Sequence, residues 1–158
     1  MIDYVRLVLS AFRQAWLVLR NRPNVTCDIR HVSGWKWYPD SVHDDQGKVI
    51  AEGIHIQGSI EFILANEGPV NTTIKGIHVE VKQRRDIPCR LNYESLCVDE
   101  RIENRIMIGA RGTWGPISLQ FGGFWLGVYE LAEHPNAELV VEPVAQQPIR
   151  TKAYLHFF

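Results

Sequence analysis

Residues 54–65 read IHIQGSIEFILA, and the alternation within this stretch decides the fold class. Apolar and polar side chains take turns along it. One face would carry Ile54, Ile56, Ile60, Phe62 and Leu64, and the opposite face would carry His55, Gln57, Ser59 and Glu61. A period of two residues is typical of a β-strand with one buried face. The stretch therefore predicts a half-buried strand.

Similar patterns extend from this strand in both directions. Residues 66–69, Asn-Glu-Gly-Pro, have the composition of a turn, and Ile77, Val79 and Val81 alternate beyond it. Gly76 predicts a bulge there, because Ile74 has the opposite parity. Residues 24–32 predict a first strand. At the C-terminal end, a hairpin is predicted in which Ala137, Leu139 and Val141 pair with Ile149, Thr151, Ala153, Leu155 and Phe157.

The segment from Ile60 to Val81, IEFILANEGPVNTTIKGIHVEV, resembles the strand-turn-strand core of immunoglobulin-like and fibronectin type III-like sandwiches. The resemblance covers about 22 residues, is generic to the fold, and implies no function. Short strands between turn signals also favour antiparallel sheets packed face to face. The expected fold is all-β: an antiparallel immunoglobulin-like β-sandwich over residues 23–158, preceded by one N-terminal amphipathic α-helix over residues 1–22. Two stretches are less regular. Residues 33–53 are expected to form a long polar connection. Val98, Ile102 and Ile106 have helical spacing, whereas residues 105–108 fit a strand equally well.

The N-terminal helix is predicted from Ile2 to Arg20, and Pro23 follows its end. Its apolar stripe consists of Val5, Leu9, Phe12, Trp16 and Leu19, which recur at spacings of four and three. With the flanking apolar residues, the apolar arc covers roughly 200° of the helical wheel, more than one docking face needs. We therefore expect the stripe to be an interface with a second subunit or a membrane surface. The alternative is a groove of the β-domain that takes up the whole helix.

The composition is that of an ordinary globular chain. The 158 residues carry a net charge of −1, which provides no global field for nucleic acid, so no nucleic-acid partner is expected. Three cysteines are a small and odd number, which does not suit a disulfide framework, and no signal sequence is evident. The expectation is a cytoplasmic protein with reduced thiols, peripheral at a membrane if the helix binds lipid.

Trp35, Trp37 and Tyr38, in the sequence GWKWYPDSVHDD, form the most unusual local cluster. They could stack on a sugar ring or another small ligand. The alternative, that the tryptophans cap the core, is favoured because aromatic residues more often serve packing. Six histidines are scattered, and His55 and His78 are expected on solvent-facing strand positions. No pair of potential ligands has chelating spacing, so neither a metal nor another cofactor is expected.

The sequence contains no nucleophile elbow, phosphate-binding loop or His-Glu-x-x-His motif, and an enzyme is the least favoured of three hypotheses. The leading hypothesis is a non-catalytic protein-interaction or scaffold module, attached to a partner or surface through its helix, with self-association as one form. The second is a carbohydrate-binding or small-ligand-binding module that uses residues 35–38.

Overall fold

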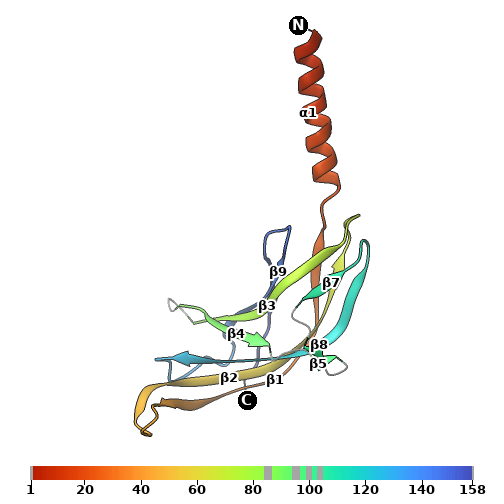
Figure 1. Cartoon of the computed structure of the whole chain (residues 1–158). Coiled ribbons are helices and arrows are strands. Elements are labelled where there is room, and N and C mark those ends of the chain that lie inside the picture. Colours follow the sequence, from red (N-terminus) through yellow and green to blue (C-terminus); the bar gives the residue numbers. More distant parts are fainter. Residues whose placement is uncertain (1, 84–86, 94–96, 99–100, 103–104, 158) are drawn as a thin grey trace.

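The computed structural model describes residues 2–83, 87–93, 97–98, 101–102 and 105–157, and Figure 1 shows its architecture. An N-terminal helix followed by antiparallel strands is what the sequence predicts, and this coarse prediction is confirmed. Within the described residues the elements are α1 (Ile2–Arg20), β1 (Val25–His43), β2 (Val49–Asn66), β3 (Thr72–Lys82), β4 (Cys89–Tyr93), β5 (Cys97–Val98), β6 (Arg101–Ile102), β7 (Ile106–Ile108), β8 (Thr113–Leu126), β9 (Asn136–Pro143) and β10 (Ile149–Ala153).

Most strands belong to one continuous sheet. Its order is β1-β2-β8-β4-β3-β9-β10, with β7 paired to β3, while β5 and β6 form a separate two-stranded sheet. The large sheet curls into a half-barrel (Figure 1). The immunoglobulin-like sandwich is not confirmed. The segment that suggested it supplies parts of β2 and β3, which lie in the same sheet with β8 and β4 between them.

Two local predictions are confirmed, the hairpin only as far as Ala153, because β10 ends there and Leu155 and Phe157 lie beyond it. In the C-terminal hairpin, Ile149 pairs with Val141, Thr151 with Leu139, and Ala153 with Ala137. A register shift between Ile74 and Gly76 places a bulge where the change of parity predicts one. The strand alternative for residues 105–108 is correct for Ile106–Ile108.

The predicted polar connection over residues 33–53 is wrong for most of its length. β1 continues to His43 and β2 begins at Val49, so the connection shrinks to residues 44–48. The two strands pair antiparallel from Val25↔Asn66 to His43↔Val49, with three register shifts along the way. The shifts explain why no regular alternation is visible in residues 33–43, because each one changes which parity faces inward.

The core fills the inside of the curl. Its largest fully buried side chains are Trp35, Phe62, Phe121, Ile54, Ile56, Ile60, Leu64, Ile74, Leu91, Ile108, Leu139 and Leu155. Part of β1 lies close to β10, the strand at the other end of the sheet, and the turn before β10 is bonded to the start of β1. There the Gln146 amide accepts a hydrogen bond from the Val25 N–H at 2.9 Å and donates one to the Val25 carbonyl at 3.1 Å.

Helix α1 takes no part in this core. It projects away from the half-barrel (Figure 1), and every side chain from Tyr4 to Arg20 is exposed. In this structure the helix therefore does not lie in a groove of the β-domain, which was the alternative prediction.

Candidate functional site

The exposed stripe of α1 is the first candidate site. All five of its residues are exposed, as an uncovered interface would be: Val5, Leu9, Phe12, Trp16 and Leu19. Phe12 is 71% exposed and Trp16 is 67% exposed. Soluble chains rarely leave a contiguous apolar surface of this kind in water.

Arginines border this stripe. At 3.6 residues per turn, Arg6, Arg13 and Arg20 fall within about 40° of one another on the helical wheel, next to Leu9 and Trp16. The helix thus combines a wide apolar arc with a narrow basic sector. Helices that lie in a membrane interface have this distribution.

The aromatic segment does not form a loop, and its three rings do not form one platform. Residues 35–38 belong to β1. Trp35 is only 2% exposed. Its ring packs edge-on against the ring of Phe157, with the ring centroids 6.2 Å apart, and its indole N–H donates a hydrogen bond to the Ser59 carbonyl at 3.2 Å. Trp37 is half-buried against the same core. Both tryptophans therefore pack against the core, which is the role that the sequence favoured for them.

Tyr38 lies on the other face of β1, because neighbouring residues of a strand point to opposite sides. It is 43% exposed and stacks on His55 of β2 with ring centroids 5.2 Å apart. His55 also borders a surface hollow with Gln57 and Asn92. The ligand-binding hypothesis stays a prediction, and Tyr38 is the one exposed ring of the three that it named.

Two of the three cysteines can be described. Cys27 and Cys89 are free thiols, as predicted, whereas the side chain of Cys97 lies outside the described residues. Burial raises the pKa of Cys27 to about 11, and this effect outweighs a hydrogen bond from Thr151, which lowers the pKa. Burial also raises the pKa of Cys89 to about 11. Because the thiolate is the reactive form, neither thiol is suited to nucleophilic chemistry at neutral pH.

His78 corrects a prediction. It lies on the outer face of β3, as its parity indicates, yet it is only 2% exposed. Its Nε2 is 3.3 Å from Oε1 of Glu80, and Arg150 donates to the same carboxylate at 2.7 Å. The hydrogen bond from Arg150 is the main reason that the pKa of Glu80 is lowered. His78 is therefore buried beside an ionic network on the outer face of the sheet, whose other members, among them Arg150, remain partly exposed.

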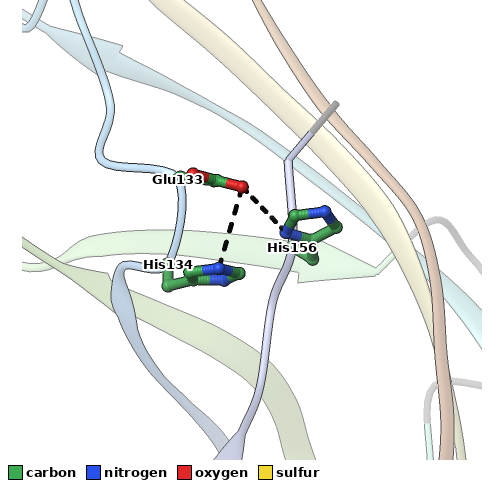
Figure 2. Close-up of side chains that lie close together, drawn as sticks. All are labelled: Glu133, His134 and His156. Atoms are coloured by element: carbon green, nitrogen blue, oxygen red, sulfur yellow. Dashed lines mark ion pairs between the residues drawn. The ribbon is translucent and has the colours of Figure 1, made fainter.

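A third group of residues, missed by sequence reasoning, is brought together by the fold. Figure 2 shows Glu133, His134 and His156 facing one another, the first two from the loop before β9 and the third from the chain after β10. Oε1 of Glu133 is 3.8 Å from Nε2 of His134 and 3.7 Å from Nδ1 of His156. The two rings stack with centroids 4.8 Å apart. No sign of this group is visible in the sequence because the two histidines lie 22 positions apart.

Comparison of the chain with protein-family models, with curated proteins and with solved structures finds no match. Among the described residues, no helix combines the length and the apolar content that crossing a bilayer requires. Function is therefore inferred from the geometry of the chain itself.

Proposed function

We propose that the chain is a non-catalytic interaction module, in which α1 attaches an immunoglobulin-like β-domain to a partner chain or a membrane surface. One observation carries the proposal: every side chain of α1 from Tyr4 to Arg20 is exposed. Fully burying a large apolar side chain contributes about 1.5–3 kcal/mol. Covering the stripe would therefore be strongly favourable. The immunoglobulin-like class of the domain is proposed from the sequence resemblance of residues 60–81 alone.

Attachment to a membrane surface is supported by the position of the charges. Basic residues near an anionic lipid surface contribute about 1 kcal/mol each. Arg6, Arg13 and Arg20 would lie at the level of the lipid headgroups while Phe12 and Trp16 enter the acyl boundary. A monolayer also covers an arc of about 200° more completely than one neighbouring helix does.

Self-association is supported by the spacing within the stripe. Residues at alternating intervals of four and three suit helix–helix packing, and a symmetric dimer is the commonest way to cover an apolar face. In this form the stripes of two α1 helices would face each other, and the arginines would flank the seam.

Vesicle flotation and light scattering test the proposal together. The full chain is mixed with phosphatidylcholine vesicles with and without phosphatidylserine, and its mass is measured without lipid. Flotation with the anionic vesicles supports membrane attachment, and a dimer without lipid supports self-association. A monomer that ignores both vesicles would overturn both forms.

Matched variants locate the effect. Phe12→Ser with Trp16→Ser should abolish binding, whereas Ser10→Ala with Gln14→Ala, in the polar sector, should not. For membrane attachment, changing the three arginines to glutamine should weaken binding to anionic vesicles by about 100-fold, from about 1 kcal/mol for each charge. For self-association, the same change should leave the mass of the dimer unaltered.

The second candidate is a small-ligand site at Tyr38. Its support is the exposed ring stacked on His55, beside the hollow that includes Gln57 and Asn92. A glycan array probed with the full chain and with Tyr38→Ala tests it. Binding that the variant loses would support the site, and an array without signal would refute the carbohydrate version.

A further inference from the structure

We propose that Glu133, His134 and His156 form a binding site for a divalent transition metal, with zinc as the best match. The site is independent of α1 and of the proposed function. Two imidazoles and one carboxylate form a ligand set that suits Zn²⁺, with a fourth position left for water.

The distances fit an ion after a small adjustment. The candidate ligand atoms of the three residues all lie within 4.8 Å of one another. Zinc binds imidazole nitrogen and carboxylate oxygen at about 2.0–2.2 Å, so tetrahedral ligand atoms lie about 3.3 Å apart. The distances close with movements of less than about 1 Å per side chain, and the two stacked rings must also rotate so that their nitrogen lone pairs converge on the ion. All three side chains are partly or largely exposed, so rotation about their own bonds can supply this movement.

The hydrogen bonding of His134 supports the same conclusion. Its Nδ1 lies 3.4 Å from the Leu155 carbonyl oxygen, a group that can only accept a hydrogen bond. A proton on Nδ1 leaves the lone pair on Nε2, the nitrogen that faces Glu133. Histidines that bind metals almost always donate their other N–H to a carbonyl or carboxylate in this way.

The fold holds both halves of the site on buried anchors. The loop that carries Glu133 and His134 is fixed on one side by Leu131, which is buried, and by Gln83. The Gln83 amide donates to the Glu130 carbonyl at 3.2 Å and accepts from the Ala132 N–H at 3.1 Å. The loop is thereby held to the end of β3.

The C-terminal half is held in the same way. Leu155 and Phe157 are buried on either side of His156, so His156 points away from the core. The Phe157 N–H donates to the Glu133 carbonyl at 3.4 Å, which ties the two halves together. Surface hollows on both sides of His134 give an ion access from solvent. A bound metal would therefore fasten the C-terminal segment to the loop before β9.

Titration with zinc tests the site. The full chain, without a histidine tag and freed of metal with a chelator, is titrated with Zn²⁺ by calorimetry and with Co²⁺ by visible absorption. We expect one ion per chain. Mg²⁺, which prefers oxygen ligands, should not compete.

Variants decide whether these residues are the ligands. Loss of an outer partner of a metal ligand weakens binding about 10–100-fold, and loss of a ligand should cost at least as much. His134→Ala, His156→Ala and Glu133→Gln should each show this loss, while His31→Ala, at an exposed position on β1, should bind as the parent does. Circular dichroism confirms that each variant is folded. No binding by the parent chain would overturn the proposal, and so would equal affinity in all four variants, which would indicate an adventitious ion only.

Discussion

Replacing Gly58 by alanine tests whether Trp35 is a packing residue or a ligand platform. The Trp35 ring lies directly on the backbone of Gly58 in β2. A Cβ added at Gly58 would meet Cγ of Trp35 at 2.5 Å and Cε2 at 2.6 Å, well inside van der Waals contact. The ring is itself held by the hydrogen bond to the Ser59 carbonyl and by Phe157, so it cannot simply swing away.

The expected magnitude follows from two opposing effects. Overpacking a core costs about 1–3 kcal/mol, so Gly58→Ala should lower the free energy of unfolding by about that amount. When the ring is absent, alanine should instead stabilise the strand by about 0.5–1 kcal/mol, because glycine loses more backbone entropy on folding. Trp35→Ala alone should cost about 3–5 kcal/mol. A chain with a typical stability of about 5–15 kcal/mol should tolerate that loss.

Urea unfolding of the parent, both single variants and the double variant measures this sign reversal. In a separate thermal unfolding experiment, Gly58→Ala in the parent background should lower the Tm by about 2–12 °C, at about 2–4 °C per kcal/mol. The control is Gly122→Ala in neighbouring β8, where the nearest atom to an added Cβ is 3.7 Å away, so no destabilisation and a gain of up to about 0.5–1 kcal/mol are expected. If Gly58→Ala has the same effect with and without Trp35, the reasoning is refuted.

Three further predictions concern the helix and the titrating groups. Deleting residues 1–20 should change the free energy of unfolding of the β-domain by less than about 0.5 kcal/mol, because α1 buries no described side chain. Urea unfolding at low protein concentration measures this change. A large loss of stability would show that α1 packs on the domain. Cys27 and Cys89 should react slowly with a thiol reagent at pH 8 in the native protein and quickly once unfolded. Their pKa near 11, against an ordinary 9.0, means that the unfolded thiols ionise first, so stability should fall as the pH rises from about 9 to 11; flat stability over this range would contradict the burial. The lowered pKa of Glu80 has the opposite effect on the pH dependence of stability. The ionised carboxylate stabilises the folded state above the ordinary pKa of 4.5, and this stabilisation is lost as the pH falls below that value. Arg150→Met should flatten that acid-side loss, and an unchanged pH profile would rule out the pair as its source.

Some features were predictable from sequence because a single physical rule determines them. The final hairpin has a clean period of two on both strands, so its two strands and their inward faces could be predicted, although the second strand is shorter than expected. The bulge at Gly76 was visible as a change of parity. In both cases the information lies within a few neighbouring residues.

Other features depend on contacts between distant parts of the chain. Parity assigned His78 to the outer face correctly, but its burial depends on Glu80 and on Arg150, 72 residues away in the sequence. The register shifts of β1 hid the strand that carries Trp35. Curling of the sheet was likewise not visible, because alternation marks the inner face of a half-barrel and of a sandwich alike.

The register shifts of β1 have a consequence for aggregation. Among the described strands β1 pairs only with β2, so the other side of this 19-residue strand lacks a backbone ladder, although Gln146 satisfies Val25 and part of the strand lies close to β10. Long open edges invite the strands of other molecules to add on. The bulges, the missing N–H of Pro39, and the charged pair Asp28 and Arg30, 3.0 Å apart, all interrupt such a template. A second molecule can therefore extend this sheet over only a few residues at a time, which protects the open edge from fibril growth.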